Sequence, residues 1–165
     1  MNPRPVIIGV GNILMGDDGV GPAAVDLLRR RGLAGRADLL DAGLAFSDVL
    51  CDIDPDRRLI VIDAVRGAGR PGTVYRLDPD DADDRDDSPV SLHEVSVVPA
   101  LRLAALAGRE FTDVTVFGVE PARLAWGEGL SPPVAGALDA LAVEIEAHLA
   151  RPAEAGRRPA GSPQP

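Results

Sequence analysis

The sequence predicts an α/β fold: a three-layer sandwich in which a twisted, mostly parallel sheet of about five strands lies between helices on both faces. Two patterns support this prediction. Short apolar runs alternate along the chain with segments whose apolar residues recur at helical spacing. The run Leu59–Ile62 is continuously apolar, without the alternation of a strand that faces water on one side, which indicates burial on both faces.

The first half of the chain supplies three of the expected strands. Val6–Val10 is a short apolar run with β-branched residues, which is typical of a buried strand. A loop from Gly11 to Gly21 follows, and Pro22 fits the first turn of a helix that Gly32 can end. After it we expect a strand near Leu39–Asp41, a short helix around Phe46–Ile53 and a central strand at Leu59–Ile62.

The second half supplies the remaining elements. Thr73–Leu77 alternates between apolar and polar residues and is therefore predicted to be a more peripheral strand. Val114–Val119 is expected to be the last strand. Helical spacing places one helix around Val97–Ala105 and a long closing helix up to Leu149, for which Ser131 can be the cap and Pro132 the first residue.

The length of 165 residues suits one domain, which we place at residues 1–150. Residues 151–165 contain four prolines and no apolar period, so they are expected to form a disordered tail. Asp78–Asp87 contains seven aspartates and one arginine, and self-repulsion favours a solvated loop there.

Composition excludes several functional classes. The chain has 17 basic and 26 acidic residues, a net charge of −9 that disfavours nucleic acids and anionic membranes as partners. Its longest uncharged stretch is too short to cross a bilayer, and we expect a soluble cytoplasmic monomer. The single cysteine, Cys51, excludes an internal disulfide and is expected to be a buried, inert thiol.

Polar residues follow the predicted strands at their carboxyl ends, where ligands bind in open α/β sheets. Asn12 and Asp18 follow the first strand, Asp41 the second and Asp63 the third, while His93 lies in a later loop. A mixed set of oxygen and nitrogen donors suits zinc, nickel, cobalt or iron. The simpler interpretation also stands at this point, since an aspartate after a strand is often a turn or capping residue and a loop histidine is often only solvated.

Other binding and catalytic motifs are absent or incomplete. Gly9-Val10-Gly11 begins a GxGxxG pattern, but its sixth position is Leu14, and no P-loop lysine follows. No GxSxG sequence is present, and His93-Glu94 lacks the second histidine of HExxH. Nucleotide binding and the common hydrolase classes are therefore disfavoured.

Five segments in a fixed order resemble the hydrogenase maturation endopeptidases. The most specific is VIIGVGNILMGDDGVG at Val6–Gly21. The others are weak motifs when taken singly, and their order along the chain makes them informative. They are Leu39–Gly43, LIVIDA at Leu59–Ala64, SLHE at Ser91–Glu94 and WGEGLSP at Trp126–Pro132.

The resemblance implies an endopeptidase of aspartyl type that removes the C-terminal extension of a [NiFe]-hydrogenase large-subunit precursor after nickel insertion. It implies that Asp18, Asp63 and His93 are catalytic residues and ligands of a nickel ion that the precursor itself supplies. It does not decide whether the metal activates a water or an aspartate acts as general base. A non-catalytic module that checks for nickel on the same fold is the alternative.

A second group of residues is assigned to substrate binding, namely Asn12, Asp41 and Gly43. Asn12 could also anchor its loop through bonds to the backbone, and this structural role is slightly favoured. The family often has Asp-Gly-Gly-Thr where this chain has Asp41-Ala42-Gly43-Leu44, and this loop is expected to help choose the hydrogenase that is served. Trp126 fits either a substrate groove or loop packing, Asp17 is taken as a mere neighbour of Asp18, and His148 is expected to be solvated.

Overall fold

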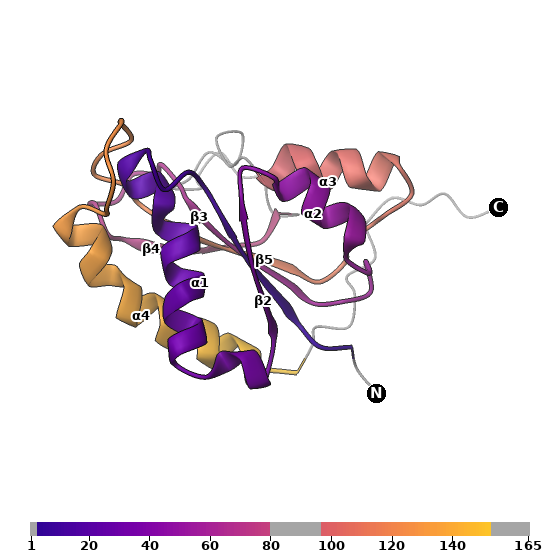
Figure 1. Cartoon of the computed structure of the whole chain (residues 1–165). Helices are drawn as coiled ribbons and strands as arrows, with labels where there is room; N and C mark the ends of the chain where they lie inside the picture. Colours follow the sequence, from indigo (N-terminus) through magenta and orange to yellow (C-terminus); the bar gives the residue numbers. More distant parts are fainter. Residues whose placement is uncertain (1–2, 80–96, 153–165) are drawn as a thin grey trace.

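The computed structural model describes residues 3–79 and 97–152 and has the three-layer architecture expected from the sequence (Figure 1). All the predicted strands and helices are present. In chain order the elements are β1 (Val6–Val10), the 3₁₀ helix η1 (Gly16–Gly19), α1 (Val20–Arg30), the 3₁₀ helix η2 (Leu33–Gly35), β2 (Asp38–Gly43), α2 (Phe46–Asp52), β3 (Leu59–Ala64), β4 (Val74–Leu77), α3 (Val97–Leu106), β5 (Val114–Val119) and α4 (Pro132–Leu149).

The five strands form one sheet in the order β2-β1-β3-β5-β4. Every neighbouring pair is parallel except β4 with β5, which confirms a mostly parallel sheet with Thr73–Leu77 at its edge. The chain runs outward from β1 to β2 and then returns to β3 on the other side of β1. The direction of winding therefore changes between β1 and β3, and such a switch point is where open α/β sheets bind ligands.

Alternate residues of the central strands enter two separate cores. Helices α2 and α3 cover one face, where Ile8 and Val61 are buried, while α1 and α4 cover the other, where Ile7 and Ile60 are buried (Figure 1). This two-sided burial explains why β3 is a continuous apolar run, as the sequence indicated. Both helical layers leave the carboxyl edge of β1 and β3 open to the loops that follow these strands.

The segment after β1 is more ordered than the sequence suggested. The expected loop Gly11–Gly21 contains the helix η1, and α1 begins at Val20 rather than at Pro22. This early start brings the helix backbone against the sheet, because a Cβ on Gly21 would lie 2.2 Å from the carbonyl oxygen of Val10. Only glycine allows so close an approach of α1 to β1.

Two expectations about single side chains were wrong. Cys51 is exposed, because it lies on the solvent-facing side of the short helix α2. The buried residues of this helix are Phe46 and Leu50. His148 is buried, with its ring edge-on to Phe117 at a centroid distance of 5.7 Å. Helix α4 packs along the sheet through its last turn, so His148 faces the core instead of water.

The segment that the sequence assigned to a tail begins in contact with the domain. The guanidinium of Arg58 donates to the carbonyl oxygens of Arg151 at 3.0 Å and of Pro152 at 2.6 Å. The rest of that segment, most of the acidic run Asp78–Asp87 and His93 lie outside the described residues. No helix within 3–79 or 97–152 has the length and apolar character needed to cross a membrane.

Candidate functional site

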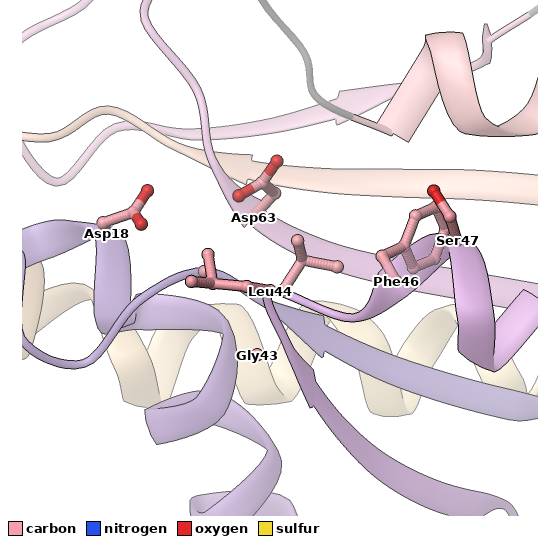
Figure 2. A pocket seen from close by; sticks show the side chains of 8 residues that line it. Asp18, Gly43, Leu44, Phe46, Ser47 and Asp63 are labelled. Atoms are coloured by element: carbon pink, nitrogen blue, oxygen red, sulfur yellow. The ribbon is translucent and has the colours of Figure 1, made fainter.

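A pocket of about 220 Å³ lies at the switch point, where the carboxyl ends of β1, β2 and β3 meet. Asp18 and Asp63 line the same pocket although they are far apart in sequence. Figure 2 shows their carboxylates at this pocket, with Leu44 and Phe46 also on its walls. The full lining consists of Val10, Gly11, Asp18, Gly43, Leu44, Phe46, Ser47 and Asp63.

Asp18 reaches the pocket from η1, where it is half-buried. Its Oδ2 accepts a hydrogen bond of 2.7 Å from the backbone N–H of Asn12, which fixes the carboxylate against the end of β1. The side chain of Asn12 in turn accepts a bond of 2.9 Å from the N–H of Leu14. Asn12 therefore has the contact that the loop-anchoring interpretation requires, and it holds the loop that orients Asp18.

The backbone around Asp18 tolerates no side chain at Gly11. This glycine has φ +123°, and a Cβ there would lie 1.8 Å from the carbonyl oxygen of Asp18. Gly11 N–H also donates to the carbonyl of Gly43 at 2.9 Å, so the loops after β1 and β2 are joined. The glycine of the first loop thus lets η1 fold back over the strand end and present Asp18 to the pocket.

Asp63 stands at the penultimate position of β3 and is 4 % exposed. Its Oδ1 accepts a bond of 2.9 Å from the N–H of Ala64, the next residue. Asp63 lies on a central strand and is held by the pairing of β3 with β5, in which it lies opposite Gly118, while the pairing of β3 with β1 ends one residue earlier at Ile62. Asp63 is thus the more rigidly placed of the two acids, as expected for the end of a buried strand.

The loop after β2 contributes backbone and apolar surface to the pocket. The pairing of β1 with β2 is regular up to Gly9 and Asp41, and then shifts so that Val10 lies opposite Gly43. Asp41 is exposed and its Oδ1 accepts a bond of 3.0 Å from the N–H of Gly43, which stabilises the turn. Of the residues assigned to substrate binding, Gly43 lines the pocket, whereas Asn12 and Asp41 act on its loops.

Asp17, the neighbour of Asp18, points the opposite way, and its role was missed in the sequence. Its carboxylate is 1 % exposed and accepts bonds from the backbone N–H groups of Ala122 and Arg123, both at 2.8 Å. It also accepts two bonds from Ser131, from the N–H at 2.6 Å and from the hydroxyl at 2.8 Å. Ser131 does precede α4, but its hydroxyl binds Asp17 and does not cap the helix.

The protonation of Asp17 follows from these contacts. Burial by itself favours the neutral carboxyl, but the hydrogen bonds from Ser131, Arg123 and Ala122 outweigh it and lower the pKa of Asp17 below its ordinary value. The group is therefore a carboxylate at neutral pH. No sequence signal separates Asp17 from Asp18, because the segment was predicted to be a loop and their different directions follow from the helix η1.

A second buried acid at the same edge of the sheet was also missed. Glu120 directly follows β5, is 8 % exposed, and its Oε2 accepts bonds from the hydroxyl of Tyr75 at 2.6 Å and from Gly67 N–H at 2.7 Å. Burial, and then the bond to Glu120, raise the pKa of the Tyr75 hydroxyl. Glu120 thereby holds the loop between β3 and β4 in place.

The donor set at the pocket fits a divalent metal only in part. Asp18 and Asp63 offer carboxylate oxygens, and His93, which completes the predicted set, lies outside the described residues. Within the residues that the structure describes, no group of three or more His, Cys, Asp or Glu side chains could hold a metal ion. Two carboxylates at one pocket can bind a metal-bearing substrate or accept a proton from a water, which are functions of a hydrolytic site.

Comparisons with known proteins agree on one family. A sequence model of the family described as hydrogenase maturation protease matches residues 22–148. The hydrogenase expression/formation protein HupD of Rhizobium leguminosarum is 30 % identical over 152 residues, which cover 90 % of this chain and 75 % of that protein. The hydrogenase 2 maturation protease of Escherichia coli is 29 % identical over 148 residues, covering 88 % and 90 % of the two chains.

The fold comparison points to the same group. The structure of the hydrogenase-maturating endopeptidase HybD from Escherichia coli superposes with a TM-score of 0.71. The sequences of the two are 27 % identical, and the alignment covers 89 % of this chain and 92 % of that one.

Proposed function

The chain belongs to the hydrogenase maturation protease family, and from this premise we propose that it removes the C-terminal extension of a [NiFe]-hydrogenase large-subunit precursor once nickel has been inserted. The observation that carries this proposal is the convergence of Asp18 and Asp63 on one pocket from two different elements. Their placement at the switch point of the sheet is where an α/β protein of this topology binds its ligand.

We assign the two acids separate tasks. Asp63, fixed on β3, would hold the metal-bearing end of the precursor in a constant position relative to the pocket. Asp18, on η1, has one oxygen bonded to Asn12 N–H and would complete the contact or accept a proton from the attacking water. His93, in a later loop of the sequence, would add a nitrogen donor.

Nickel in this proposal belongs to the substrate. A nickel ion in the precursor would polarise the carbonyl of the bond to be cleaved. Two carboxylates and one imidazole are an incomplete donor set for nickel, so the protein alone would bind the free ion weakly. A precursor that already holds the ion through its own ligands completes the set. Cleavage would then depend on a difference in affinity between loaded and empty precursor.

The direct test incubates the purified chain with large-subunit precursor prepared with and without nickel, and measures the mass of the precursor. We expect loss of a C-terminal peptide from the loaded precursor alone. Asp63→Asn should abolish the cleavage, whereas Asp52→Asn, a change of the same kind at an exposed position of α2, should not affect it. Binding of loaded precursor without any mass loss would instead indicate a non-catalytic checking protein.

A further inference from the structure

Exposed apolar side chains are most frequent on the loops at the carboxyl edge of the sheet, the edge at which the pocket lies. Eight large apolar side chains are exposed among the described residues, and four of them lie on the loops at the carboxyl edge of the sheet. Leu44 lines the pocket, and Ile13 and Leu14 follow the pocket residue Gly11. We call Ile13, Leu14, Leu44 and Trp126 the apolar rim.

The backbone of Gly127, the residue after Trp126, links Trp126 to the segment that carries Ile13 and Leu14. Its neighbour Gly127 donates to the carbonyl of Leu14 at 2.9 Å, and Gly16 donates to the carbonyl of Gly127 at 2.8 Å. Figure 1 shows the result, with the orange loop that precedes α4 beside the indigo turn after β1. The side chain of Trp126 is nevertheless 76 % exposed, so it does not pack into its own loop.

The loop that carries Trp126 is held at both ends by one side chain. Asp17 binds the N–H groups of Ala122 and Arg123 where the loop begins and Ser131 where it ends. The middle of the loop is fixed by the ladder between Gly127 and the segment 14–16. A large aromatic side chain on so restrained a backbone loses little further freedom on binding, which is a property of the residues that dominate interfaces.

We propose that the apolar rim is the specificity surface of the pocket and binds an apolar side chain of the precursor close to the bond that is cleaved, with Trp126 as the principal contact. This inference rests on the proposed function. The chemistry selects the occupant: the rim is apolar, Asp18 and Asp63 lie beside it, and the chain carries a net charge of −9, so an acidic segment would be repelled. An apolar segment without acidic residues satisfies both conditions.

Steady-state cleavage of nickel-loaded precursor tests this assignment. Trp126→Ala should raise KM at least about tenfold while kcat stays within about threefold, because the contact is made before the chemistry and is lost uniformly. Trp126→Phe should restore most of the affinity. Val143→Ala, which removes an exposed apolar side chain from α4, is the matched control and should leave both constants unchanged. An unchanged KM for Trp126→Ala, with wild-type cleavage intact, overturns the inference and leaves the proposed function standing.

A binding measurement separates the two hypotheses when cleavage itself fails. Trp126 is the single tryptophan of the chain, so incorporation of fluorotryptophan gives one fluorine NMR signal that unlabelled precursor does not obscure. We expect this signal to shift when loaded precursor is added, and precursor affinity to fall at least about tenfold in Trp126→Ala. A shift without cleavage supports the rim and refutes the protease. A signal that does not move while precursor binds refutes the rim.

Discussion

The two ends of the sheet both bury charged groups, but they treat them differently. At the amino end, Arg58 precedes β3 and its guanidinium is bonded to Asp113 at 3.0 Å and to the main-chain carbonyls of Arg151 and Pro152. At the carboxyl end, Asp18 and Asp63 line a pocket. The cation at the amino end is enclosed by groups of the chain itself, whereas the two carboxylates at the carboxyl end line a pocket.

This difference distinguishes charged side chains that stabilise the fold from charged side chains that bind a ligand. A buried cation with a carboxylate and carbonyls around it is stable in place, and removing it leaves those partners unpaired. Two carboxylates that line one pocket give it a negative charge, which favours the binding of a cationic group. Substitutions at the two ends should therefore affect different quantities, and the following predictions test that separation.

The largest effect is expected at the pocket. Asp63→Ala should reduce kcat for precursor cleavage about a thousandfold, because Asp63 sits on the rigid β3 strand and no neighbour can replace it. Asp18→Glu should retain activity, since the half-buried side chain of Asp18 lines the pocket and one more methylene can extend into that cavity. The measurement is single-turnover cleavage with circular dichroism as the folding control. An active Asp63→Ala beside an inactive Asp18→Glu would reverse the ranking.

At the amino end we expect a loss of stability without a loss of activity. Arg58→Met should lower the free energy of unfolding by about 3 kcal/mol, because Asp113 and the carbonyls of the 148–152 segment lose their donor. Arg30→Met removes an exposed arginine paired with Asp26 and should change it by less than about 0.5 kcal/mol. Denaturant titration measures both. A drop in kcat for Arg58→Met under conditions where the variant is folded would show that the amino end also affects activity, and would contradict this prediction.

Asp17 is expected to behave as a structural charge although it lies at the carboxyl end. Asp17→Asn should lower the free energy of unfolding by about 2 kcal/mol, because an amide cannot accept all four of its bonds. The pKa of Asp17 is lowered on folding, so its contribution is present above its unfolded pKa of 3.8 and is lost as the pH falls below that value. Acid titration of wild type and variant should therefore converge at low pH.

The smallest effect is expected from His148. Its two ring nitrogens have no hydrogen-bond partner within the described part of the chain. Burial lowers the pKa of His148, the positive charges of Arg58, Arg76 and Arg151 lower it further, and Asp113 opposes them. The unfolded state therefore takes up a proton first as the pH falls below 6.5, and stability declines by at most about 1.4 kcal/mol per pH unit.

A variant isolates this contribution. His148→Leu should flatten the stability profile between pH 6.5 and lower pH relative to wild type, and should be no less stable at neutral pH because it removes two unpartnered polar atoms. Thermal unfolding over a series of buffers measures it. A parallel pH profile for the two proteins would show that another group titrates there.

The sequence predicted the elements well because burial on both faces leaves a strong apolar signal. Leu59–Ile62 was assigned by that signal and the edge strand at Thr73–Leu77 by its alternation of apolar and polar residues, and both strands are present. Asp18 and Asp63 were placed at one pocket because both follow parallel strands. Roles that depend on direction were beyond reach: nothing in the letters separates Asp17 from Asp18, or tells whether His148 on an amphipathic helix faces the sheet.

The contacts of Arg58 with the end of α4 also impose an order on biosynthesis. Its carbonyl partners lie 90 to 94 residues later in the chain, so a ribosome that has delivered β3 has not yet made them. Until α4 and the two residues after Ala150 emerge, Asp113 can already pair with this cation, but the guanidinium lacks its carbonyl acceptors and the start of β3 stays partly hydrated. Full closure of this end of the domain therefore waits for the final turn of α4 and the residues that follow it.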